Sequence, residues 1–137
     1  MHEFRTQRRV EFSDTDVGGI VHFARFFVFM ETAEHEFLRA LGTSVHLDVD
    51  GQKIGWPRVS ATCEYLAPAR FEDVLDIHVR VERKGSKSMT YAFEITRGET
   101  AIARGRVTSV CCILNAPGGV KAIPIPAFLA DRIEEAP

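Results

Sequence analysis

One long amphipathic segment followed by a series of alternating segments is the pattern that most constrains how this chain folds. Between residues 22 and 41, apolar side chains recur at steps of three and four, which predicts a helix with one wide buried face. The residues on this face are Phe23, Phe26, Phe27, Met30, Ala33, Phe37, Leu38 and Leu41, and Gly42 follows as a helix stop. Because so much aromatic surface is unstable in water, we expect a sheet to cover this helix, with Phe23, Phe27 and Met30 in the core.

The rest of the chain alternates between apolar and polar residues, as strands with one buried face do. We predict strands at 5–12, 58–66, 74–83, 87–97 and 100–114. Hairpin turns are predicted at Gly85-Ser86 and Gly98-Glu99, a loop at 43–57 and a short helix at 126–135. One helix combined with an antiparallel meander predicts an α+β domain in which a curved antiparallel sheet wraps a long central helix.

Length and composition predict a single domain spanning residues 1–137. Hydrophobic residues make up 45% of the sequence and charged residues 26%, which is ordinary for a globular protein. The net charge of −2 argues against nucleic acid as a partner. We expect no membrane partner either, because the most apolar stretch, 20–30, is too short to span a bilayer and no secretory signal is visible.

The three cysteines, Cys63, Cys111 and Cys112, argue against both a disulfide framework and a zinc site. Their number is odd, and no pair has the C-x-x-C spacing. Cys111 and Cys112 lie in an apolar strand-like run, where we expect small core and surface residues rather than nucleophiles. A reducing, cytoplasmic location fits this cysteine usage best.

The segment from Asp14 to Phe23 carries the strongest signal for chemistry. It places two carboxylates, Asp14 and Asp16, and a flexible Gly-Gly step between a predicted strand and the long helix. An acidic side chain there can lie beside the free N–H groups of a helix N-terminus, which attract anions. A carbonyl substrate at this junction would meet a base on one side and hydrogen-bond donors on the other. That combination suits the hydrolysis of an activated acyl group.

Two simpler interpretations of this segment are a calcium loop and a plain turn. An EF-hand loop starting at Asp14 would have Gly19 at its sixth position, as required, but Gly18 stands where a ligand is needed. Arg25 occupies the twelfth position, where calcium needs a bidentate Glu, so a calcium site is excluded. A turn or helix-capping role fits Asp14 better than Asp16, and we expect Asp14 to be structural.

The chain resembles the hotdog-fold acyl-CoA thioesterases, in the branch of the 4-hydroxybenzoyl-CoA thioesterases and their YbgC-like members. The resemblance covers nearly the whole sequence. The residues that carry it are Asp14-Thr15-Asp16, Gly18-Gly19-Ile20-Val21, the Phe-rich helix, Trp56-Pro57-Arg58-Val59, Tyr65-Leu66-Ala67-Pro68-Ala69, Asp73 and Lys87-Ser88. The Asp-x-Asp motif with its glycines is fairly specific, whereas the strand alternation is not.

The resemblance implies roles for several residues of the chain. Asp16 is similar in position to the family's catalytic carboxylate. The backbone amide of Phe23, with His22 adjacent, is similar to the group that polarises the thioester carbonyl. Glu31 falls where family members have an acidic residue facing the acyl pocket, although an acid paired with an arginine is the alternative. His22 could contact the substrate, but a lone His near a helix start is more often a surface or capping residue.

Further substrate contacts are expected from the helix, the turn and the loops. Phe27, Gly19 and Trp56 are the candidates for the acyl pocket, and Trp56 could instead be simply packed. A basic turn suits the phosphates of CoA and consists of Arg83, Lys84, Lys87 and Ser88. A solvated hairpin tip explains this turn nearly as well, and Gly85-Ser86 stands where the hydroxybenzoyl enzyme carries more arginine.

The predicted function is therefore hydrolysis of an acyl-CoA to a carboxylic acid and CoA. No Ser-His-Asp triad is indicated, so a carboxylate acts on the thioester as nucleophile or general base. No metal or redox cofactor is expected, since His35, His46 and His78 lack metal-ligand spacing. The resemblance implies a homodimer or a tetramer formed as a dimer of dimers, with shared sites. The acyl group stays open between aromatic and aliphatic classes.

Two other functions remain possible at this point. A hotdog enoyl-CoA hydratase or dehydratase would use a His at the helix entrance and an acidic partner, roles that His22 and Glu36 could fill. The Pro-Gly elements usual after that His are missing here, because Ala24-Arg25-Phe26 follows Phe23. The second possibility is a non-catalytic acyl-CoA-binding module.

Overall fold

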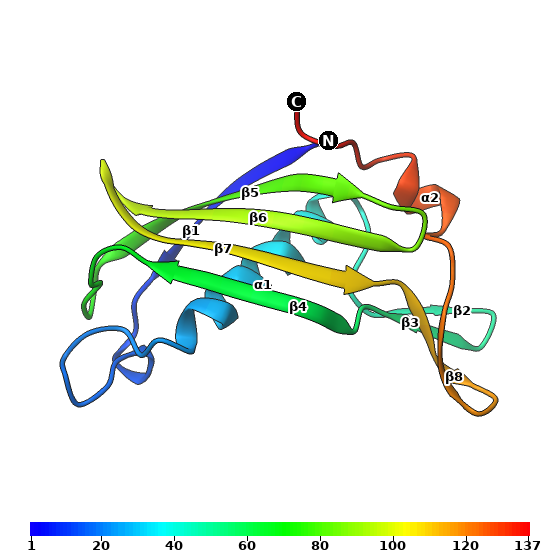
Figure 1. Cartoon of the computed structure of the whole chain (residues 1–137), viewed down its shortest axis with the longest axis horizontal. Coiled ribbons are helices and arrows are strands. Elements are labelled where there is room, and N and C mark those ends of the chain that lie inside the picture. The colour runs from blue at the N-terminus through cyan, green and yellow to red at the C-terminus, as the bar shows by residue number, and fades with distance from the viewer.

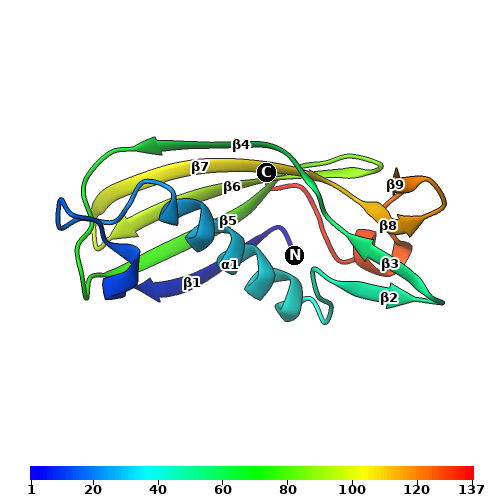
Figure 2. The same cartoon turned by 90° about the horizontal axis from the view of Figure 1, so that it is seen from below.

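A curved antiparallel sheet of five strands wraps one side of a long helix, α1 (Arg25–Ala40) (Figures 1 and 2). The computed structural model describes all residues from Met1 to Pro137. The spatial order of this sheet is β1 (Glu3–Arg9), β5 (Val74–Lys84), β6 (Ser88–Arg97), β7 (Thr100–Val110) and β4 (Arg58–Tyr65). The predicted α+β fold, with a sheet around a central helix, is confirmed.

A second, smaller sheet lies beyond the C-terminal end of α1. Its order is β2 (Leu47–Val49), β3 (Gln52–Gly55), β8 (Cys112–Ala116) and β9 (Gly119–Ala122). A short 3-10 helix, η1 (Phe12–Asp14), precedes α1, and a short helix, α2 (Ala127–Ala130), follows β9. Both chain ends meet near β5, where the Met1 ammonium group donates a hydrogen bond to the Arg132 carbonyl oxygen at 2.8 Å (Figure 1).

The hydrophobic core lies between α1 and the concave face of the large sheet. Phe29, Met30 and Phe37 of the helix are completely buried against strand residues of β5, β6 and β7. The helix approaches β7 so closely that a Cβ atom on Gly105 would lie 2.2 Å from the Met30 Sδ atom. A residue larger than glycine at position 105 would therefore displace the end of the Met30 side chain and lie within 3.1 Å of the Thr62 carbonyl oxygen.

The structure corrects the predicted helix in two respects. It begins at Arg25 rather than at His22, because a turn comes between the Gly-Gly step and the first helical residue. Phe23 is therefore outside the helix and 63% exposed, which contradicts its predicted place in the core. Phe27 is half-buried, whereas Phe29 and Glu34 lie on the buried face instead.

The strand predictions are corrected mainly at the small sheet. The predicted loop 43–57 contains β2 and β3, and β9 was not predicted at all. The single strand predicted at 100–114 is broken at Cys111, whose N–H donates a hydrogen bond to the Lys87 carbonyl oxygen. Cys111 and Cys112 are both buried, so neither is the predicted surface residue. The short C-terminal helix is limited to Ala127–Ala130.

Strand β4 forms one open edge of the large sheet. None of its eight residues is buried, and the side chain of Val59 is 63% exposed. Its backbone pairs with β7 on one side only. An edge strand of this kind offers unpaired N–H and C=O groups to another chain. None of the helices has the length and apolar character needed to cross a membrane.

Candidate active site

Asp16 lies in a tight turn between η1 and α1, held by hydrogen bonds within the turn. The Gly19 N–H donates to the Asp16 carbonyl oxygen at 2.9 Å, and the Gly18 N–H donates to Asp16 Oδ1 at 2.9 Å. Gly19 has a φ of +77°, a conformation that residues with a side chain rarely adopt. A Cβ atom on Gly18 would lie 3.1 Å from Asp16 Oδ1. The Gly-Gly step therefore fixes an exposed carboxylate without crowding it.

Asp14, two residues earlier, has the opposite environment. Its side chain is completely buried and accepts hydrogen bonds from Arg25 Nε at 2.9 Å and Arg25 Nη2 at 2.7 Å. Asp14 Oδ2 also accepts a hydrogen bond from the Glu11 N–H, and Arg8 lies 3.6 Å from Oδ1. These contacts tie the turn to the first residue of α1. They agree with the structural role predicted for Asp14.

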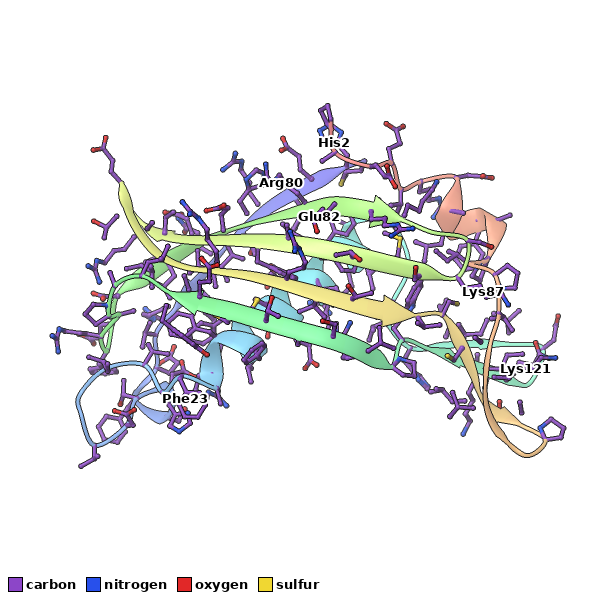
Figure 3. The ribbon with its side chains drawn as sticks, in the orientation of Figure 1. His2, Phe23, Arg80, Glu82, Lys87 and Lys121 are labelled. Atoms are coloured by element: carbon purple, nitrogen blue, oxygen red, sulfur yellow. The ribbon has the colours of Figure 1, made fainter.

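An open, mainly apolar pocket of about 470 Å³ lies beside Asp16. Its walls come from the Asp16 turn, the entrance of α1 and the segment after β4: Asp16, Ile20, Val21, Phe23, Phe26, Tyr65, Leu66, Ala67, Pro68 and Ala69. Phe23 marks this end of the molecule in Figure 3. A larger hollow of about 570 Å³ along β1, β5 and β6 is lined mainly by polar residues and includes none of these. The pocket beside Asp16 is therefore the better site for an acyl group.

The backbone amide of Phe23 faces no hydrogen-bond acceptor within the chain. It belongs to the turn just before the positive end of the α1 helix dipole. His22, its neighbour, is engaged: His22 Nδ1 accepts a hydrogen bond from the Ala24 N–H at 3.1 Å, and its ring stacks on Phe23. His22 is also absent from the pocket wall. The Phe23 N–H thus has no partner within the chain, whereas His22 bonds the backbone just ahead of the helix.

The predicted acyl-pocket residues Phe27 and Glu31 line a different, smaller hollow of about 100 Å³ between α1 and β4. The side chain of Glu31 is 55% exposed, and its carboxylate lies 3.8 Å from Arg58 Nη2. Beneath it, Glu34 is buried and accepts two hydrogen bonds from Arg58 Nη1, at 2.8 and 2.7 Å. Burial raises the pKa of Glu34 above its ordinary value, while the bonds from Arg58 act in the opposite direction.

Sequence reasoning missed Glu34, although one signal was present. It falls on the buried face of α1, between Ala33 and Phe37, where an acid needs a partner of opposite charge. The other two predicted substrate contacts lie apart from the pocket walls. Trp56 is packed in the hydrophobic core, and Gly19 closes the Asp16 turn. Within one chain the structure therefore brings together Asp16 and Phe23, but not Phe27, Glu31 and Trp56.

The basic turn between β5 and β6 lies at the opposite end of the molecule from the Asp16 pocket (Figure 3, where Lys87 and Phe23 are labelled). The side chain of Lys84 binds the C-terminal segment: its Nζ donates hydrogen bonds to the carbonyl oxygens of Ala130 and Ile133, each at 2.9 Å. Arg83 and Lys87 are exposed, and Ser88 is half-buried. Arg83 and Lys87 thus remain free to meet an anion, whereas Lys84 is engaged as a structural residue.

The residues considered for hydratase chemistry do not meet. Glu36 pairs with Thr6 of β1, and His22 bonds the chain just ahead of α1. No group of three or more His, Cys, Asp or Glu side chains is arranged to hold a metal ion. The acid–base pair that a hydratase would need is therefore not assembled in this chain.

Comparison with known proteins identifies the family. The sequence model of the thioesterase superfamily matches residues 18–104 of the chain. The acyl-CoA thioester hydrolase YbgC of Escherichia coli O6:H1 is 30% identical over 110 residues, which cover 80% of this chain and 81% of that protein.

Two solved structures extend this similarity to the fold. The 1,4-dihydroxy-2-naphthoyl-CoA thioesterase Slr0204 from Synechocystis has a TM-score of 0.85 at 25% identity, covering 95% of this chain and 94% of its own. The gentisyl-coenzyme A thioesterase BH1999 has a TM-score of 0.81 at 30% identity, covering 94% and 98%. These matches confirm the predicted hotdog fold and the predicted thioester hydrolysis. The chain belongs to the thioesterase superfamily and is a thioester hydrolase with the hotdog fold.

Proposed function

We propose that this enzyme hydrolyses acyl-CoA in the pocket beside Asp16, with the Phe23 amide as oxyanion donor. As a general base, Asp16 takes a proton from water while the water oxygen attacks the thioester carbonyl carbon. The carbon–sulfur bond then breaks, and CoA leaves as a thiolate that takes up a proton. As a nucleophile, the Asp16 oxygen displaces the CoA thiolate to form a mixed anhydride, which water then hydrolyses. Both routes give a carboxylic acid and free CoA.

The observation that carries this proposal is that two residues line the same apolar pocket: Asp16, whose exposed carboxylate is held by the Gly18 N–H, and Phe23, whose backbone N–H has no partner within the chain. Hydrogen bonds to a developing oxyanion contribute roughly 3–4 kcal/mol in hydrolases. The reaction uses only water and the thioester, so the proposed mechanism needs no metal or redox cofactor. The three cysteines are free thiols, which suits the cytoplasmic location expected from the sequence.

An aromatic acyl group is our first choice of substrate. Slr0204 is named as a 1,4-dihydroxy-2-naphthoyl-CoA thioesterase and BH1999 as a gentisyl-coenzyme A thioesterase, and both of these acyl groups are aromatic. In the present chain the rings of Phe23, Phe26 and Tyr65 line the pocket and offer flat surfaces for stacking. We therefore propose an aryl-CoA ahead of an aliphatic acyl-CoA.

A panel of acyl-CoA thioesters tests this function. We expect the purified enzyme to release free thiol, measured with a chromogenic disulfide reagent, and kcat/KM to be higher for benzoyl- and naphthoyl-CoA than for acetyl- or palmitoyl-CoA. Faster cleavage of the aliphatic members would overturn the choice of acyl group. Absence of thiol release across the panel, with binding retained, would favour the acyl-CoA-binding module instead.

We further propose that the working unit contains at least two chains. The unpaired edge of β4 offers backbone groups for pairing, and Val17, Phe23 and Tyr65 leave apolar surface exposed around the Asp16 pocket. A second copy can cover this surface and bring its own residues to the pocket, including those that lie far from Asp16 within one chain. A homodimer, or a tetramer formed as a dimer of dimers, would pair the β4 edge and cover the apolar surface around the pocket.

Sedimentation velocity should accordingly show a dimer or tetramer at micromolar concentration. Val59→Lys, which places a charge on the exposed β4 edge, should shift the distribution toward monomer and lower kcat with it. The matched variant Val120→Lys, on the exposed strand β9, should do neither. A wild-type enzyme that is fully active as a monomer would contradict the shared site.

The basic turn should affect CoA affinity through Arg83 and Lys87. Removing both charges in Arg83→Gln/Lys87→Gln should raise KM for acyl-CoA about tenfold at low salt and leave kcat nearly unchanged, because the phosphates lie away from the reacting bond. The effect should shrink at high salt, where exposed charges are screened. Lys53→Gln/Lys121→Gln, which removes two exposed charges elsewhere, is the control. An unchanged KM would mean that the turn is only a solvated hairpin.

A further inference from the structure

Tyr65, the last residue of the edge strand β4, reaches across to the turn that carries the Phe23 amide. Its hydroxyl donates a hydrogen bond to the Phe23 carbonyl oxygen at 2.9 Å. Its ring packs edge-on against Phe26, with ring centroids 5.6 Å apart, and forms part of the pocket wall. Desolvation raises the pKa of the Tyr65 hydroxyl above its ordinary value, so the group stays protonated and continues to donate.

This bond is the only hydrogen bond that Phe23 makes within the chain. The flanking residues are anchored separately: the Val21 N–H donates to the Ala69 carbonyl oxygen, and the His22 N–H donates to the Asp14 carbonyl oxygen, both at 2.8 Å. The Phe23 ring cannot fix the turn by packing, because it is 63% exposed. The Tyr65 hydroxyl thus joins the Phe23 backbone to the sheet, in addition to the local hydrogen bond from the Ala24 N–H of the same peptide group to His22 Nδ1.

We propose that the Tyr65 hydroxyl is a positioning residue for thioester cleavage, which holds the Phe23 backbone so that its N–H faces the thioester carbonyl. The assignment rests on the proposed role of the Phe23 amide. The Tyr65 hydroxyl holds the peptide group on one side of the Phe23 Cα atom. The peptide group on the other side, which carries the Phe23 N–H, is held through the His22 carbonyl oxygen, which accepts a hydrogen bond from the Arg25 N–H at 2.9 Å. An oxyanion donor is effective only when its direction is set before the reaction. The same bond links the donor to β4, the strand at the open edge of the sheet.

Two substitutions separate the hydroxyl from the ring. Tyr65→Phe keeps the ring against Phe26 and removes only the hydrogen bond, so we expect kcat to fall roughly two- to tenfold with KM unchanged. Tyr65→Leu also removes the aromatic wall, so KM should rise in addition. Tyr91→Phe makes the same change at the other tyrosine, which is buried in the core, and should leave kcat at the wild-type value. The assays use the most rapidly cleaved member of the acyl-CoA panel.

A spectroscopic measurement tests the positioning directly. Infrared difference spectra of this thioester bound intact to Asp16→Asn should show its C=O stretch at a lower frequency than in water, because the Phe23 amide polarises it. In Asp16→Asn/Tyr65→Phe the shift should be smaller, an effect that a loss of stability alone does not produce. Wild-type kcat in Tyr65→Phe, or an unchanged C=O shift in the double variant, overturns the assignment. Full activity of Asp16→Asn would instead overturn the proposed function, and the assignment with it.

Discussion

Asp16→Asn should lower kcat for acyl-CoA hydrolysis by about a hundredfold or more, the loss expected when a positioned base or nucleophile is removed. The substitution is almost isosteric, and an amide oxygen can still accept the hydrogen bond from the Gly18 N–H that holds the side chain. Because the pocket is mainly apolar, KM should change much less than kcat. Steady-state kinetics on the fastest substrate of the panel measure both constants.

Asp14→Asn is the matched control, because it makes the same chemical change two residues away. Asp14 is buried and accepts two hydrogen bonds from Arg25, so its loss should destabilise the fold and lower the unfolding midpoint. The remaining folded enzyme should keep most of its activity per molecule. A folded but inactive Asp14→Asn beside an active Asp16→Asn would mean that the carboxylates have the reverse roles. Normal hydrolysis by both variants would refute the mechanism.

Arg58→Met should produce the largest loss of stability, roughly 3–5 kcal/mol in the free energy of unfolding. The substitution keeps an apolar stem but leaves the Glu34 carboxylate buried without its partner. Burial already raises the pKa of Glu34, and loss of Arg58 removes the opposing effect. Because this loss is a large fraction of the stability of a typical domain, urea unfolding at low temperature is the appropriate measurement.

Two further variants show whether the lost stability comes from breaking a buried ion pair or simply from removing a positive charge. Glu34→Leu/Arg58→Met removes both charges and should be more stable than Arg58→Met alone, because no buried charge is left unpaired. Arg106→Met breaks the exposed pair with Glu82 on the outer face of the sheet, which should cost only about 0–1 kcal/mol. If the double variant were less stable than Arg58→Met, Glu34 would be stabilised by groups other than Arg58.

The amino-acid pattern was sufficient for the parts of the fold that depend on neighbours in the sequence. The three- and four-residue spacing of apolar side chains identified α1, and strict alternation identified β5 and β6, because both patterns follow from the geometry of a single element. The Asp-x-Asp motif with its glycines placed Asp16 in a turn ahead of the helix, as observed. Periodicity could not place the first helical residue, because a turn closed by the hydrogen bond from the Arg25 N–H to the His22 carbonyl oxygen precedes the helix.

The tertiary structure alone decided which distant residues meet. Strand β3, inside the predicted loop 43–57, is recognisable only by its pairing with β8, Ile54 with Ile113, across some sixty residues of chain. The partnership of Glu34 with Arg58 and the use of Lys84 to hold the C-terminal segment likewise follow from packing and from sheet register. Local periodicity reports only which face of an element is buried, whereas partners are chosen when elements pack and each buried polar group must find a hydrogen bond.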